Sequence, residues 1–251
     1  MVIQDLYNKI TKELEREAIK KFDSKEEYFN WGKLYNENRV SKAYGLSAPE
    51  IRKIVKEFTK EFNDLSFEQK IDLSKQFYNA DYIAQTVFGL KLLELSITSI
   101  NPQNLKILEE IVNSLKDWGP TDAFSLDIMQ PLLRKYPNQT KLLLKKWNKS
   151  DHIWTKRVSI VTFTRKIGSE GEHVDFLLEL CDHLIWDKED LIRKAIGWAL
   201  KDNMIGSNKE KVLSYVKNLR KMGVSSTITL YAIRNVKGKE RDEVLKIKPS
   251  K

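Results

Sequence analysis

The chain has 251 residues, 41% hydrophobic and 31% charged, a composition ordinary for a globular protein. Its formal net charge is +9 at pH 7, and residues 201–251 hold 13 basic and 5 acidic residues, a net of +8. No apolar run approaches the roughly 18 residues of a membrane span, and no Cys/His cluster has zinc-ligand spacing. The single cysteine excludes an internal disulfide framework.

The first segment, MVIQDLYNKITKELEREAIKKF, is an amphipathic charged helix without the apolar stretch of a signal peptide. Cys181 lies in the apolar helical run FLLELCDHLI, which favours a buried thiol in a reducing compartment. We therefore expect a cytoplasmic protein.

Apolar residues recur with helical period in segments of about 12–18 residues, separated by short breaks rich in Pro, Gly, Asn or Ser. Strand-type alternation is missing, so the sequence predicts an all-α protein. We predict helices over these ranges: 3–22, 24–31, 47–63, 66–78, 80–97, 102–117, 120–135, 138–148, 151–167, 172–184, 187–203, 207–222, 225–235 and 238–246.

Internal repetition is faint but detectable. Apolar helices of similar length begin near residues 80, 120, 152 and 188. A spacing of about 35–40 residues is typical of HEAT or armadillo α-solenoids. We expect one domain over residues 1–251, with a compact helical bundle as the competing architecture.

Asp122 is the first candidate site residue. Pro120 fits the first turn of a helix, which would put Asp122 at about the third helical position. The helix dipole and nearby free N–H groups would favour the ionised carboxylate there, which suits stabilisation of a positive charge. The alternative is that Asp122 completes a helix N-terminus and Trp118 packs beside it.

The predicted helix over 151–167 supplies the second candidate group. Trp154 and Arg157 are three residues apart and Arg165 follows eight later, so all three would share roughly one face. An aromatic residue followed by two arginines matches a groove along a phosphate backbone. A surface helix with solvated arginines is the alternative.

The predicted helix over 187–203 carries Lys194, Trp198 and Lys201 on one face, and Gly197 would let something approach closely. A tryptophan flanked by lysines on the polar face suits a polyanion, although packing is equally compatible. The opposite face supplies apolar packing through Leu191, Ile192, Ala195, Ile196 and Ala199. The other tryptophans are expected to be structural: Trp31, Trp147 and Trp186.

Taken together, these segments resemble the AlkD-type DNA alkylation repair glycosylases, HEAT-like-repeat proteins that remove alkylated purines from duplex DNA. The opening YGLSAPEIR, residues 44–52, is similar to the family's aromatic/Gly-x-x-x-Pro-x-x-Arg pattern. W-x-x-x-D at 118–122 and W-x-x-R at 154–157 match further motifs, and KAIGW at 194–198 is the most specific match. Gly119-Pro120 departs from the bulkier polar residues of many relatives.

The resemblance implies a right-handed α-solenoid of HEAT- or armadillo-like helix pairs with a concave basic DNA-binding cleft. It implies catalytic roles for Asp122, Trp118 and Trp198. It implies DNA-binding roles for Arg157, Arg165, Lys194, Lys201, Trp154 and Tyr35, the last as the third aromatic residue of the cleft. The expected protein is a monomer that needs no cofactor or metal and binds double-stranded DNA containing alkylated bases.

The implied activity is hydrolysis of the N-glycosidic bond of positively charged N3- or N7-alkylated purines, with Asp122 stabilising the oxocarbenium-like sugar and positioning water. Two alternatives stay open. One is a non-catalytic HEAT-repeat protein that binds damaged or distorted DNA, and the other is a helical-repeat scaffold that meets an acidic protein partner.

Overall fold

The computed structural model describes residues 2–27 and 42–249, and within these ranges it contains helices, turns and one isolated bridge between Lys42 and Tyr82. The prediction of an all-α protein is confirmed for the described residues. The backbone contacts divide the chain into two compact units, Met1–Leu132 and Leu133–Lys251. The solenoid handedness, the concave basic cleft and the single domain stay predictions.

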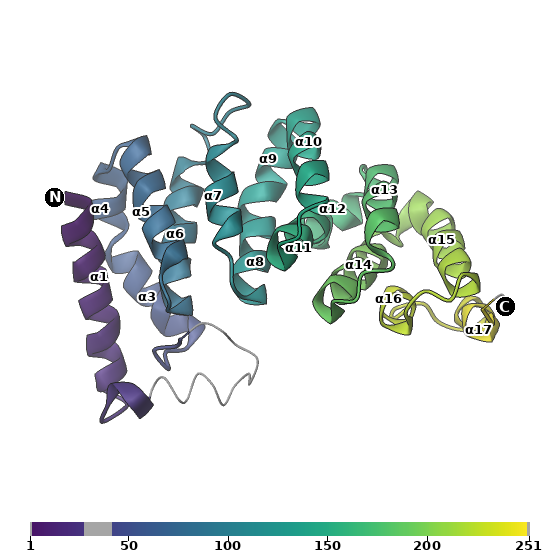
Figure 1. Ribbon diagram of the computed structural model, residues 1–251, viewed down its shortest axis with the longest axis horizontal. Helices are drawn as coiled ribbons and strands as arrows, with labels where there is room; N and C mark the ends of the chain where they lie inside the picture. Colours follow the sequence, from purple (N-terminus) through teal and green to yellow (C-terminus); the bar gives the residue numbers. More distant parts are fainter. Residues whose placement is uncertain (1, 28–41, 250–251) are drawn as a thin grey trace. The chain divides into compact units, whose positions relative to one another are not determined.

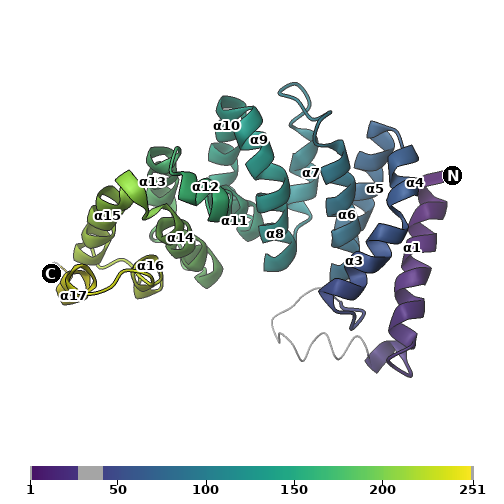
Figure 2. The ribbon, with the colours of Figure 1, turned by 180° about the vertical axis from the view of Figure 1, so that it is seen from behind.

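The N-terminal unit is built around aromatic and aliphatic residues from several helices. In both views α5 lies between α1 and α6, and α5 packs against each of them (Figures 1 and 2). Phe62, Phe77 and Phe88 are fully buried at the centre of this core. The helices of this unit are α1 (Val2–Ile19), α3 (Ala48–Glu57), α4 (Thr59–Asp64), α5 (Phe67–Asn79), α6 (Ile83–Ser96), α7 (Ile107–Asn113) and α8 (Trp118–Phe124).

The segment predicted as one helix over 120–135 contains a change of helical period. After α8, residues Ser125–Met129 form a turn of π-helix, and α9 (Gln130–Lys135) follows and contains the boundary between the two units. The Ser125 hydroxyl donates to the Thr121 carbonyl oxygen at 2.7 Å. Such turns occur frequently at functional sites, and this one directly follows the helix that carries Asp122.

The C-terminal unit is organised around α14, which packs against α11, α12 and α16. In Figures 1 and 2, α14 lies between α11 and α16. The helices of this unit are α10 (Pro137–Asn148), α11 (Ile153–Val161), α12 (Arg165–Glu170), α13 (Val174–Leu184), α14 (Asp190–Asn203), α15 (Lys209–Lys221), α16 (Ser226–Ala232) and α17 (Lys239–Lys246).

The prediction of one continuous helix over 151–167 is wrong, because the chain turns between α11 and α12. The hydroxyls of Thr162 and Thr164 donate to carbonyl oxygens of the last turn of α11, at 2.7 and 2.8 Å. Such side-chain hydrogen bonds compete with helix continuation. The helix predicted over 47–63 is likewise interrupted, at Phe58.

Gly197 allows α14 and α16 to approach each other closely. A Cβ on residue 197 would lie 2.7 Å from the Tyr231 Cβ and 2.9 Å from the Ile228 carbonyl oxygen. The partner that the glycine admits is therefore another helix of the same chain, and Tyr231 is held beside α14 as a result.

Replacing Gly197 with alanine should lower the free energy of unfolding by about 1–3 kcal/mol, because the added methyl group forces two backbones apart. Gly119→Ala is the matched control, since its Cβ would meet only the Asp117 carboxylate, at an ordinary 3.7 Å. The control should be neutral or stabilising by up to about 1 kcal/mol. Equal effects of the two changes in denaturant unfolding would contradict the close packing at Gly197.

Candidate functional site

Helix α8 begins earlier than the sequence predicts. Asp117 is its N-cap, and the Asp117 carboxylate accepts a hydrogen bond from the Gly119 amide at 3.1 Å. Trp118 is therefore the first helical residue, which makes Asp122 the fifth. The predicted place of Asp122 in the first turn is wrong, and Asp117, not Asp122, caps the helix.

Trp118 and Asp122 are one helical turn apart, which puts them on the same side of α8. Trp118 is 44% exposed, whereas Thr121 and Phe124 on the other side are fully buried. Asp122 is half-buried. The N-terminal unit therefore presents an indole ring and a carboxylate side by side at its surface, and their catalytic roles stay predictions.

Two cations of α11 contact the first turn of α14 and the segment just before it. Arg157 is 5% exposed, and its guanidinium donates to the Leu191 carbonyl oxygen. Lys156 pairs with Asp187 at 2.7 Å. Burial alone would raise the pKa of Asp187, but Lys156 and the Glu189 N–H lower it below its usual range. Arg157 therefore contributes to the packing of α11 on α14, and its contact with phosphate stays a prediction. Trp154, on the same helix, is half-buried.

Arg165 does not share a helix with Trp154 and Arg157, because it begins α12. Its φ of +51° lies in the left-handed region, which costs a residue with a side chain about 1–3 kcal/mol. The Arg165 amide donates to the Asp202 carboxylate at 2.6 Å. The guanidinium carbon lies 5.5 Å from the centroid of the Trp198 ring, within range of a cation–π contact.

The faces of α14 are divided as the sequence predicts. Four residues of the predicted apolar face are fully buried, namely Ile192, Ala195, Ile196 and Ala199. Trp198 and Lys201 are half-buried, and Lys194 is exposed and pairs with Asp190 at 2.7 Å. Lys201 pairs with Asp202 at 3.0 Å, and its ammonium lies 5.8 Å from the Tyr231 ring centroid.

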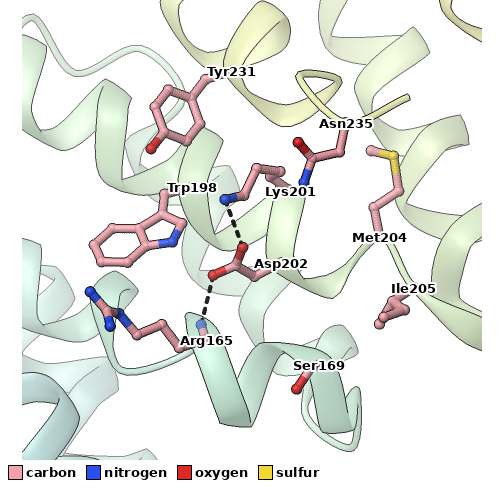
Figure 3. Close-up of a pocket in the computed structure, with 9 residues that line it drawn as sticks. All are labelled: Arg165, Ser169, Trp198, Lys201, Asp202, Met204, Ile205, Tyr231 and Asn235. Atoms are coloured by element: carbon pink, nitrogen blue, oxygen red, sulfur yellow. Dashed lines mark hydrogen bonds and ion pairs between the residues drawn. The ribbon is translucent and has the colours of Figure 1, made fainter. Parts of the chain in front are cut away.

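A cleft of about 750 Å³ lies within the C-terminal unit (Figure 3). It brings together three predicted residues, Arg165, Trp198 and Lys201, whereas Lys194, Trp154 and Arg157 are not among its lining residues. The full lining is Arg165, Ser169, Trp198, Lys201, Asp202, Met204, Ile205, Tyr231 and Asn235. In Figure 3 the Trp198 ring lies between the Arg165 guanidinium and Tyr231.

The sequence prediction missed Asp202, Tyr231 and Asn235. A signal for Tyr231 exists, because the spacing aromatic-x-x-cation of Trp198 and Lys201 recurs in Tyr231 and Arg234. The Arg234 guanidinium carbon lies 5.9 Å from the Tyr231 ring centroid. Cations placed over electron-rich rings in an open cleft can bind an anionic backbone while the rings contact sugars or bases.

Other expectations have mixed outcomes. Trp147 and Cys181 are buried as predicted, but Trp186 is 59% exposed and is not a core residue. Tyr35 and Trp31 lie outside the described residues. Over the described ranges, no cluster of three His, Cys, Asp or Glu residues could hold a metal, and no helix is long and apolar enough to cross a membrane.

Comparisons with known proteins give one family. The family model described as "DNA alkylation repair enzyme" matches residues 10–236. A solved structure described as a predicted DNA alkylation repair enzyme from Enterococcus faecalis matches 85% of this chain and 96% of its own, with a TM-score of 0.73 and 16% identity. At that identity the likeness establishes the fold. No curated protein sequence matches the chain.

The two arginines should respond differently to substitution. Arg157→Ala leaves the Leu191 carbonyl oxygen without its buried donor and should lower the free energy of unfolding by about 1–3 kcal/mol. Arg165→Gly places a residue suited to positive φ at an exposed position and should leave stability unchanged or raise it by up to about 1 kcal/mol. Denaturant unfolding of both variants is the measurement, and equal losses would contradict the different environments described for them.

Proposed function

The chain belongs to the family of DNA alkylation repair enzymes, and from this premise we propose that it is a glycosylase for N3- or N7-alkylated purines in duplex DNA. Alkylation at either nitrogen gives the base a positive charge. When the bond between that base and C1′ breaks, the electron pair goes to the base and neutralises it, so no acid is needed to protonate the leaving group. Water then adds to C1′ and loses a proton.

Asp122 is the proposed catalytic residue. Its carboxylate would stabilise the positive charge that develops on the sugar and would orient the attacking water as its proton leaves. Trp118, one turn away and 44% exposed, would contact the electron-poor deoxyribose with the face of its ring.

The proposed DNA contacts in the C-terminal unit lie in and around the cleft. Trp198 would contact the deoxyribose or backbone with its ring, while Arg165 and Lys201 would bind phosphate. Outside the cleft lining, Lys194, Trp154 and Arg157 keep their proposed DNA-binding roles. Because Arg157 is buried and donates to the Leu191 carbonyl oxygen, we expect it to contribute more to the packing of α14 than to DNA affinity.

One observation carries this proposal above the others. The Arg165 guanidinium lies over the Trp198 ring in an open cleft, and the described residues give that guanidinium no carboxylate partner. A guanidinium that lies over a ring and is not paired with a carboxylate suits a ligand that brings its own negative charge. The phosphates of DNA are such a ligand, and a DNA ligand is consistent with the DNA alkylation repair family.

Asp122→Asn should reduce base release from a duplex containing one N7-methylguanine by at least about 100-fold, because a preorganised charge is lost at the reacting sugar. DNA affinity should stay within a few-fold of wild type. Asp127→Asn is the matched control, since Asp127 is an exposed carboxylate on the following turn, and it should keep full activity.

The other outcomes of the base-release experiment would favour a different role for Asp122 or for the protein. A fully active Asp122→Asn variant would remove Asp122 from the mechanism. Tight binding without release by the wild-type protein would favour a damage-binding protein, and neither binding nor release would favour a protein-interaction scaffold.

Arg165→Gln should make DNA binding less dependent on salt. Loss of one phosphate contact lowers the steepness of log affinity against log salt concentration by about 0.9. Lys221→Gln removes the same charge from α15, outside the cleft lining, and should leave the slope unchanged. Equal slopes for Arg165→Gln and wild type would exclude the proposed contact.

A further inference from the structure

Asp202, at the end of α14, joins two parts of the cleft. One carboxylate oxygen accepts from the Arg165 amide at 2.6 Å, and the other pairs with the Lys201 ammonium at 3.0 Å. Figure 3 shows both contacts. Only 15% of the Asp202 side chain is exposed, so water competes little for either contact.

The backbone that Asp202 holds is under strain. Arg165 is the one residue other than glycine with positive φ in the described ranges, at +51°. A strained conformation persists where the surroundings fix it, and it is common at binding sites. Here it turns the chain between α11 and α12, next to the guanidinium that lies over Trp198.

Two neighbouring residues also hold the turn against α14. The side-chain amide of Asn203 donates to the Phe163 carbonyl oxygen at 2.8 Å. Gly168 lets α12 sit directly on α14, because a Cβ there would lie 2.8 Å from the Asp202 Cβ. Asn203 and Gly168 thus bring the turn to α14, and Asp202 supplies the acceptor for the strained amide.

We propose that Asp202 is a positioning residue for DNA binding: it holds Arg165 in the left-handed conformation that places its guanidinium over Trp198. The inference rests on the proposed function, since it assumes that the cleft binds DNA. Lys201 neutralises part of the carboxylate charge, which reduces the repulsion between Asp202 and phosphate.

The positioning role and simple electrostatics predict opposite changes in DNA affinity when Asp202 is removed. Removing an acidic residue from a phosphate-binding cleft should strengthen DNA binding if only charge matters. If Asp202 positions Arg165, its loss should weaken binding although the net charge becomes more positive.

The test compares Asp202→Ala with Asp202→Asn in binding to an undamaged duplex at fixed salt. Both changes remove one negative charge, but asparagine keeps an oxygen that can accept from the Arg165 amide. We expect alanine to weaken binding by about fivefold or more and asparagine to bind as tightly as wild type or tighter. Asp190→Ala, which removes an exposed carboxylate that pairs with Lys194, should not weaken binding. Equal effects of alanine and asparagine would overturn the proposal.

Two further measurements test the hold on Arg165 without relying on the DNA affinity of the single Asp202→Ala variant. In an Arg165→Gly background, glycine adopts positive φ freely and needs no support. Adding Asp202→Asn or Asp202→Ala to that background should then change DNA affinity equally, and a difference between them would count against the proposal.

The second is hydrogen exchange of the Arg165 amide without DNA, which should be slow in wild type and Asp202→Asn and at least about tenfold faster in Asp202→Ala. Unchanged exchange would overturn the proposed hold on Arg165. Failure of the wild-type protein to bind any duplex would instead contradict the proposed function.

Discussion

The cleft of the C-terminal unit depends on the close approach of two helices to α14. Gly197 brings α16 close enough to place Tyr231 beside Trp198, and Gly168 brings α12 close enough to place Arg165 over it. Larger residues at either glycine would separate the backbones and open the cleft. The cation–aromatic arrangement is therefore a consequence of helix packing, and its geometry depends on two glycines that let the helices approach.

Helical periodicity predicted the fold well, because each segment has one apolar face. It failed where the chain turns without glycine or proline. Thr162 and Thr164 end α11 through their own hydroxyls, and their β-branched side chains look compatible with a helix. Pro120 predicts a helix that starts at residue 120, whereas Asp117 caps α8 and the first helical residue is Trp118.

The candidate site was predictable residue by residue only in part. Helical spacing predicts Arg165, Trp198 and Lys201 as members of polar helix faces, and the structure brings them into one cleft. Asp202 gave no signal, since one acid near a lysine is ordinary in sequence, and its role depends on the strained turn at Arg165. Arg157 shows the reverse case: its motif suggested exposure, whereas the packing of α11 on α14 buries it.

We propose that DNA contacts both the face of α8 that carries Asp122 and the cleft lined by α12 and α14. Hydrogen–deuterium exchange with and without a duplex containing N7-methylguanine tests it most directly. Exchange should slow on binding in residues 118–125, in the turn at 162–166 and in residues 201–206, and stay unchanged in α1 and α15. Binding that leaves exchange in those three segments unchanged would show that DNA contacts neither surface.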